Sequence, residues 1–109
     1  MDKLTKQETY TMFSNLAKQY GVLDHKHSNA GHDRVYLGKA DSNKALFLAC
    51  SRVNKMCIYI DSPEKTLLSQ NGFICVPETA KTVSYEYKCY IETNDFEPFF
   101  KAVKNYLDI

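Results

Sequence analysis

The chain has 109 residues, of which 44% are hydrophobic and 25% are charged, a balance that is typical of one globular domain and excludes a disordered chain. The 14 basic and 13 acidic residues leave a formal net charge of +1, which disfavours a dedicated duplex-DNA binder, because such a protein needs many cationic side chains to neutralise phosphates. No apolar run approaches the roughly 20 residues that span a bilayer, and the polar start lacks the apolar stretch of a secretory signal, so we expect one cytoplasmic domain over residues 1–109 with no membrane partner.

The first predicted element is a helix that begins after Thr5 and ends near Tyr20. Thr5 and Glu8 have the spacing of a capping box, in which each side chain accepts a hydrogen bond from the other residue's backbone N–H. Gly21 suits the left-handed residue that follows a helix. A largely apolar stripe at steps of three and four predicts that one side of this helix packs on a core. The stripe consists of Thr9, Met12, Phe13, Leu16 and Tyr20.

A polar stretch follows at residues 24–33, and it contains all three histidines of the chain, His25, His27 and His32. Imidazole and carboxylate groups are ligands that zinc prefers. One hypothesis is therefore a metal site formed by these histidines. The alternative is a solvated loop, because Gly and Asn in the same stretch are typical of polar connections. The stretch is longer than most loops, which favours a functional or mobile segment.

Residues 34–92 carry the β-branched, aromatic and aliphatic runs that predict strands. The runs cover residues 34–39, 44–53, 55–60, 72–76 and 82–92. Short breaks rich in Asn, Ser, Gly and Pro separate them, which indicates antiparallel neighbours in a meander-like sheet of about five strands. Residues 45–50 and 56–60 are apolar on both faces, as expected in the middle of a sheet.

The last strand and the closing helix complete the predicted fold. Residues 82–92 alternate with period two, so that Tyr85, Tyr87 and Cys89 share one face. The helix is predicted to begin at Asn94 or Asp95 with Glu97 in a second capping box. Its apolar stripe consists of Phe96, Phe99, Phe100, Val103 and Leu107. The fold class is therefore α+β, with both helices on the same face of the sheet.

The four cysteines, Cys50, Cys57, Cys75 and Cys89, all fall within predicted strands and form no C-x-x-C pair. In a reducing cytosol they are expected to be core thiols, with disulfides or metal binding as the alternatives. A catalytic thiolate needs an exposed and electropositive setting, which a strand interior does not supply. Glycine-rich phosphate-binding motifs are also missing from the sequence. We therefore expect no cofactor and favour a protein that is not an enzyme.

Candidate binding residues come from the tyrosines and basic residues of the predicted strands. The chain has 8 tyrosines and no tryptophan. Tyrosine side chains on a solvent-facing row can anchor a protein partner or stack on bases, and neighbouring cations can hold phosphates. The alternative is that these rings simply pack in the core. The predicted binding residues are Arg34, Tyr36, Arg52, Lys55, Lys88 and Tyr90.

Residues 55–106 contain a two-sided apolar strand at 56–60, an alternating strand at 83–91 and a helix start at 94–97. In this arrangement the segment resembles a small α+β domain of unknown function that occurs alone or fused to nucleases and methyltransferases of restriction-type systems. The resemblance is architectural and carries over no functional residue. It implies a non-catalytic accessory role in nucleic-acid processing.

The preferred hypothesis is a non-catalytic binding or accessory module that presents a sheet face or edge to a macromolecule. A protein partner or self-association is favoured, for example by pairing of strand 34–39 across a homodimer, and nucleic acid is the other partner class. One alternative is a metal-dependent enzyme or sensor that uses His25, His27 and His32. Another is a small protein inhibitor of a larger complex.

Overall fold

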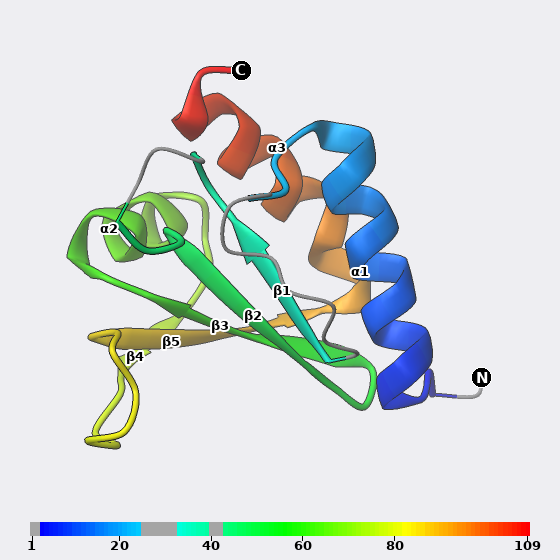
Figure 1. Cartoon of the computed structure of the whole chain (residues 1–109), viewed down its shortest axis with the longest axis horizontal. Coiled ribbons are helices and arrows are strands. Elements are labelled where there is room, and N and C mark those ends of the chain that lie inside the picture. The colour runs from blue at the N-terminus through cyan, green and yellow to red at the C-terminus, as the bar shows by residue number, and fades with distance from the viewer. Residues whose placement is uncertain (1–2, 25–32, 40–42) are drawn as a thin grey trace.

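An antiparallel sheet forms the framework of the chain, with one terminal helix before it in the sequence and one after it, both on the same face (Figure 1). The computed structural model describes residues 3–24, 33–39 and 43–109. The elements are α1 (Lys6–Tyr20), β1 (Arg34–Leu37), β2 (Phe47–Arg52), β3 (Lys55–Ile60), α2 (Ser62–Gln70), β4 (Cys75–Pro77), β5 (Tyr87–Glu92), the short 3-10 helix η1 (Thr93–Asp95) and α3 (Phe96–Leu107). The predicted α+β class is therefore confirmed.

The sheet has the strand order β1-β2-β3-β5-β4, and all its pairs are antiparallel. The first three strands form a meander, and a tight turn with Asn54 at φ 61° joins β2 to β3. After β3 the chain departs from the predicted meander, because β4 lies at the far edge and β5 returns between β3 and β4. The strand order thus places β3 at the centre of the sheet and β2 beside it, as their two-sided apolar patterns predicted.

Helix α2 is the element that the sequence did not reveal. It begins with Ser62-Pro63, a pair that occurs both in turns and in the first turn of helices, and it was predicted as a turn. Asp61 occupies the N-cap position, but its side chain makes no capping hydrogen bond. Leu68 is fully buried and anchors α2 to the core.

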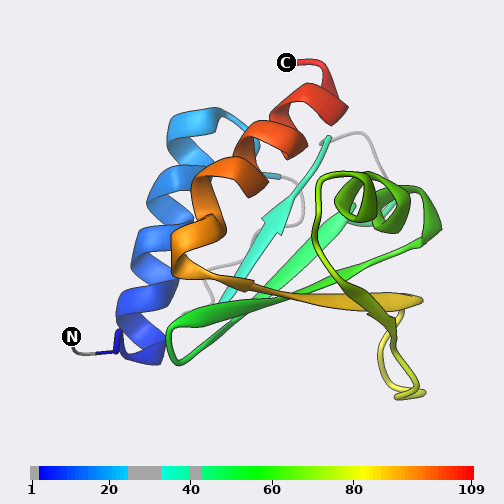
Figure 2. The same ribbon diagram turned by 180° about the vertical axis from the view of Figure 1, so that it is seen from behind.

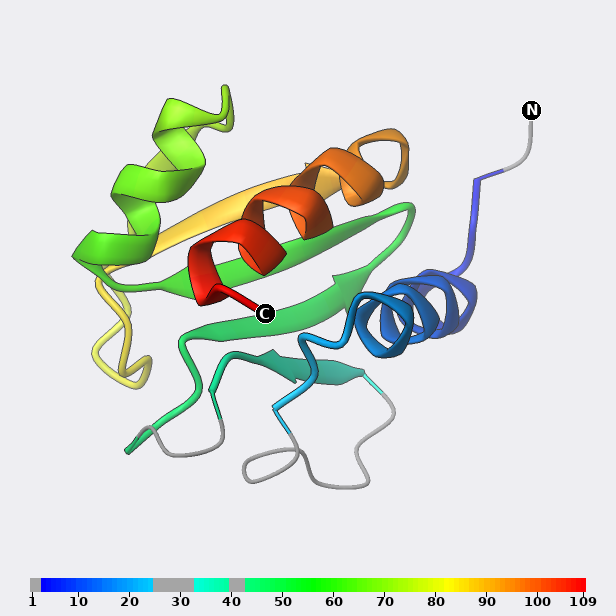
Figure 3. The same cartoon turned by 90° about the horizontal axis from the view of Figure 1, so that it is seen from above.

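The three α-helices of the described chain lie on one face of the sheet (Figures 2 and 3). Between them and the sheet lies a single cluster of buried apolar side chains. Four phenylalanines of α1 and α3 form its centre, with ring centroids of Phe13 and Phe100 4.7 Å apart and those of Phe13 and Phe96 5.1 Å apart. The same-face packing of the terminal helices is thus confirmed.

The ends of the two terminal helices differ from each other. At α1 the capping box is confirmed, because the Glu8 amide donates to Thr5 Oγ1 at 3.0 Å and the Thr5 amide donates to Glu8 Oε1 at 2.9 Å. Gly21 ends α1 with φ 73°. The capping box predicted for α3 is wrong. The chain enters α3 through η1, so Asp95 has φ −103° and ψ 4° and not the extended conformation that directs an N-cap side chain at the helix amides.

The two last strands are shorter than the sequence predicted. Residues 82–86 do not extend β5, because their polar groups have partners elsewhere: the Glu86 amide donates to Asp61 Oδ1 at 3.1 Å, and the Tyr85 hydroxyl donates to the Ala45 carbonyl at 2.6 Å. The connection between β4 and β5 instead turns to the side of the sheet opposite the helices (Figure 1). Within the described ranges, no helix combines the length and the apolar character needed to cross a bilayer.

Candidate functional site

The candidate site is the face of the sheet that points away from the helices, here called the outer face. Its side chains follow from the strand registers, which place Arg34, Cys50, Cys57 and Tyr90 in one row across the sheet. A second row contains Tyr36, Leu48, Tyr59, Lys88 and Val76. Beyond the first row, Arg52, Lys55 and Glu92 form a third. The six predicted binding residues therefore all lie on the outer face.

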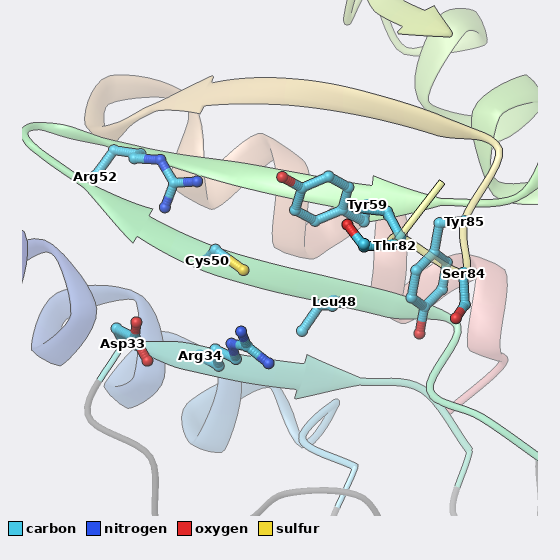
Figure 4. Close-up of a pocket in the computed structure, with 10 residues that line it drawn as sticks. Asp33, Arg34, Leu48, Cys50, Arg52, Tyr59, Thr82, Ser84 and Tyr85 are labelled. Atoms are coloured by element: carbon cyan, nitrogen blue, oxygen red, sulfur yellow. The ribbon is translucent and has the colours of Figure 1, made fainter. Parts of the chain in front are cut away.

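A hollow of about 480 Å³ opens on the outer face over β1, β2 and β3 (Figure 4). We call it the arginine hollow. Arg34 and Arg52 extend toward it from opposite sides of Cys50, and the Tyr59 ring lies farther along the same surface. Its lining consists of Asp33, Arg34, Leu48, Cys50, Arg52, Tyr59, Thr82, Val83, Ser84 and Tyr85. The loop before β5 forms part of this lining and partly covers β2 and β3 on the outer face. This cover explains why both strands are apolar on both faces.

The loop that closes one end of the hollow is held by contacts distant in sequence. Lys44 donates from Nζ to the Ser84 carbonyl at 2.6 Å and forms an ion pair of 2.8 Å with Asp61. The Tyr85 hydroxyl donates to the Ala45 carbonyl, and burial raises the pKa of Tyr85 to about 12. Sequence reasoning missed Lys44, Asp61 and Ser84, because no local pattern links residues 25 or 40 positions apart. These contacts preform one wall of the hollow.

The basic side chains of the outer face differ in the partners they have. Lys88 lies 3.3 Å from Glu78, and this contact raises the pKa of Lys88. Lys55 lies 4.9 Å above the centre of the Tyr90 ring, beside its cross-strand neighbour Glu92. In the described part of the chain neither Arg34 nor Arg52 forms an ion pair with a carboxylate. Among the described residues neither arginine is thus neutralised by an ion pair, although Asp33 interacts with Arg34 and Arg52 Nη1 donates to the Ser51 carbonyl at 3.0 Å.

A second, shallower hollow of about 400 Å³ lies toward the β4 edge, and we call it the apolar hollow. Its lining consists of Gly72, Phe73, Ile74, Val76, Lys88, Tyr90 and Asp95. Ile74 is 83% exposed and Tyr90 is 48% exposed. Large apolar side chains that gather on a surface beside a charged region are typical of an interaction site. The apolar hollow therefore extends the candidate site across the whole sheet.

The four cysteines form two cross-strand neighbour pairs, one on each face of the sheet. Cys50 faces Cys57 on the outer face, and Cys75 faces Cys89 on the helix side. Three of them are buried and Cys75 is half-buried, so the prediction of buried free thiols is confirmed for three, of which Cys89 belongs to the core cluster. Burial raises the pKa of Cys50 despite the nearby arginines, and burial raises the pKa of Cys89 to about 12. A reactive thiolate is therefore disfavoured at either position.

Thiol labelling checks this arrangement. In native protein at neutral pH, Ellman's reagent is expected to modify Cys75 first and the three buried cysteines at least about tenfold more slowly, because the protonated and shielded thiol reacts poorly. The variant Cys75→Ser is expected to lose the fast phase. In denaturant all four thiols are expected to react quickly. Fast labelling of Cys50 in native protein would contradict the buried placement.

The predicted metal site cannot be placed, because His25, His27 and His32 lie outside the described residues. Within residues 3–24, 33–39 and 43–109, no group of three or more His, Cys, Asp or Glu side chains is arranged to hold a metal ion. The metal hypothesis for the histidines stays a prediction.

None of the protein families, curated proteins or solved structures compared with the chain matches it. The resemblance of residues 55–106 to a restriction-associated domain likewise stays a prediction. The function of this chain therefore has to be inferred from the geometry of the outer face.

Proposed function

We propose that this chain is a non-catalytic binding module that docks an anionic macromolecule, protein or nucleic acid, on the outer face of its sheet. One observation carries the proposal: Arg34 and Arg52 extend toward a single hollow on a sheet face that no described helix covers. Guanidinium groups without a carboxylate partner suit carboxylate or phosphate ligands, which they bind through paired hydrogen bonds.

The outer face supports binding more than chemistry. The thiol in the arginine hollow, Cys50, has a raised pKa, so it is a poor nucleophile at neutral pH. The exposed side chains of Tyr90 and Ile74 offer contact area that a folded core does not use. The four cysteines are free, as expected for a protein in a reducing compartment. We therefore propose a cytoplasmic location.

Two anionic probes test the proposal by NMR. Isotope-labelled protein is titrated with a single-stranded RNA of about 12 nucleotides and, separately, with a peptide of about ten glutamates. At least one probe is expected to shift the backbone amides of β1, β2 and β3 while leaving the exposed side of α1 unchanged. Lys18 on α1 is exposed and basic, so it reports charge attraction that is not specific to the outer face.

Two results of this titration would contradict the proposed function. Shifts that spread equally over Lys18, Lys104 and the outer face would show that only bulk charge attracts the probes, and the proposal would be wrong. The same conclusion follows if neither probe shifts the outer face at low salt, where electrostatic attraction is strongest.

A further inference from the structure

We infer that the anionic partner is a single-stranded nucleic acid whose phosphates bind Arg34 and Arg52 and whose bases stack on Tyr59 and Tyr90. This inference rests on the proposed function and names the partner class. It depends on three features of the outer face: the two arginines, the size and lining of the arginine hollow, and the adjacency of the two hollows.

The arginines come first, because neither forms an ion pair with a carboxylate in the described part of the chain. The pKa of Arg34 is raised, mainly through its interaction with the Tyr36 hydroxyl, which lies beside it on β1. Asp33 also lines the arginine hollow, and its charge contributes to the raised pKa of Arg34, but its carboxylate lies 4.0 Å from Lys6 Nζ as well. A planar guanidinium matches two oxygens of one phosphate. Two such groups on either side of Cys50 suit successive phosphates or one phosphate held from two sides.

The hollow itself is larger than a carboxylate needs. Its volume of about 480 Å³ lies in the range of pockets that enclose drug-sized ligands, whereas a glutamate side chain would occupy only a small part of it. The Tyr59 ring supplies an aromatic surface, and the hydroxyls of Thr82 and Ser84 can bond to base edges. The lining therefore suits a nucleotide unit better than an acidic peptide.

The two hollows adjoin each other on the sheet at Tyr59 and Lys88, where Lys88 forms its ion pair with Glu78. Tyr59, which lines the arginine hollow, is the cross-strand neighbour of Lys88, which lines the apolar hollow. Neighbouring strands lie about 4.8 Å apart, so an extended strand of nucleic acid can pass from one hollow to the other over β3 and β5. There it meets Tyr90, whose ring carries Lys55 on one face and leaves the other for a base, and the apolar side chains of Val76 and Ile74. Stacking on aromatic rings of an open antiparallel sheet is an established way to bind unpaired bases.

A single strand fits this surface better than a duplex. In a duplex the bases are stacked on each other and their faces cannot reach Tyr59 or Tyr90. The net charge of +1 is also low for a protein that must hold two phosphate backbones. The expected ligand is thus an unpaired segment of RNA or DNA.

Fluorescence anisotropy tests the inference with labelled strands of about 12 nucleotides, oligo-U and oligo-dT. Binding in the micromolar range is expected at low salt, as for contacts that are not sequence-specific. The double variant Arg34→Ala/Arg52→Ala is expected to weaken binding at least about tenfold. It is also expected to reduce the slope of log affinity against log salt by about 1.4, because two phosphate contacts are lost from a single strand.

The matched control is Lys18→Ala/Lys104→Ala, which removes the same charge from the exposed surfaces of α1 and α3. Its affinity is expected to stay within about twofold of the wild type, because these lysines lie away from the outer face.

Tyr90→Leu keeps an apolar side chain at a half-exposed position and should fold. It is expected to weaken binding about tenfold through loss of stacking. Melting temperatures of all variants identify any that have lost stability.

Each result separates the inference from the proposed function. The inference is overturned if binding of oligo-U and oligo-dT ignores salt, if the arginine variant binds like the lysine control, or if a duplex of equal length binds as tightly. If the glutamate peptide shifts the outer face and no oligonucleotide does, the partner is an acidic protein segment, and only the proposed function stands. If neither probe reaches the outer face, both are wrong.

Discussion

The variant Phe99→Ala is expected to lower the free energy of unfolding by about 3–5 kcal/mol, because it leaves a cavity in the centre of the core. Phe99 is fully buried, and its ring centroid lies 5.3 Å from that of Phe100 and 5.8 Å from that of Phe13. It also meets the Phe47 and Phe73 rings edge-on at 6.2 Å. Phe99 therefore connects α1, α3, β2 and the segment after α2.

Urea unfolding followed by circular dichroism measures this loss, which is a large share of the stability of a domain of this size. Phe99→Leu is the matched control, since it keeps most of the apolar volume and should lose clearly less. A loss below about 1 kcal/mol for Phe99→Ala would mean that the helices collapse into the cavity, and the close-packed phenylalanine core described here would be wrong.

The second large effect is expected at Tyr106. Its hydroxyl donates to Glu64 Oε2 at 2.8 Å, and Glu64 is only 4% exposed. Tyr106→Phe removes this donor and leaves a buried carboxyl group without it, so the free energy of unfolding should fall by about 1–3 kcal/mol. The contact joins α2 to α3. Thermal and urea unfolding at neutral pH measure the loss.

The same hydroxyl predicts a pH dependence. Burial, followed by the bond to Glu64, raises the pKa of Tyr106 to about 12 from its ordinary value of 10.0. A raised pKa in the folded state stabilises the fold below pH 10, and this contribution is lost as the pH rises through 12. The stability difference between wild type and Tyr106→Phe should therefore shrink across this interval.

A double variant serves as the control for Tyr106. Glu64→Met combined with Tyr106→Phe removes both polar partners and fills the site with apolar atoms, so it should be more stable than Tyr106→Phe alone. If Tyr106→Phe has wild-type stability, the Glu64 carboxyl group must reach water, and its burial as described would be wrong.

Local signals in the sequence predicted a large part of the fold. The capping box at Thr5 and Glu8 and the left-handed Gly21 set the ends of α1, because these contacts join residues within one turn. The period-two pattern placed Cys89 and Ile91 on the covered face and Lys88 and Tyr90 on the other. For β5, alternation alone thus identified which side chains lie on the outer face.

The arginine hollow could not be predicted, because long-range contacts form it. Residues 82–86 alternate like a strand, but Asp61 and Ala45 take the hydrogen bonds of Glu86 and Tyr85 and draw the loop across the sheet. Helix α2 was missed for a related reason. Its start, Ser62-Pro63, is compatible with a turn, and the burial of Leu68 that favours a helix exists only after folding.

The two borders of the sheet determine how copies of this chain can meet. At β1 the backbone already bonds to the preceding segment, since the Asp24 amide donates to the Tyr36 carbonyl at 2.8 Å and the Gly38 amide donates to the Val22 carbonyl at 3.1 Å. At β4 the strand has only 3 residues and ends at Pro77, which has no N–H to offer. Lateral pairing is therefore disfavoured at each border of the described sheet, and with it both growth into fibrils and the pairing of strand 34–39 across a homodimer that the sequence suggested. The broad outer face is left as the surface that meets other molecules.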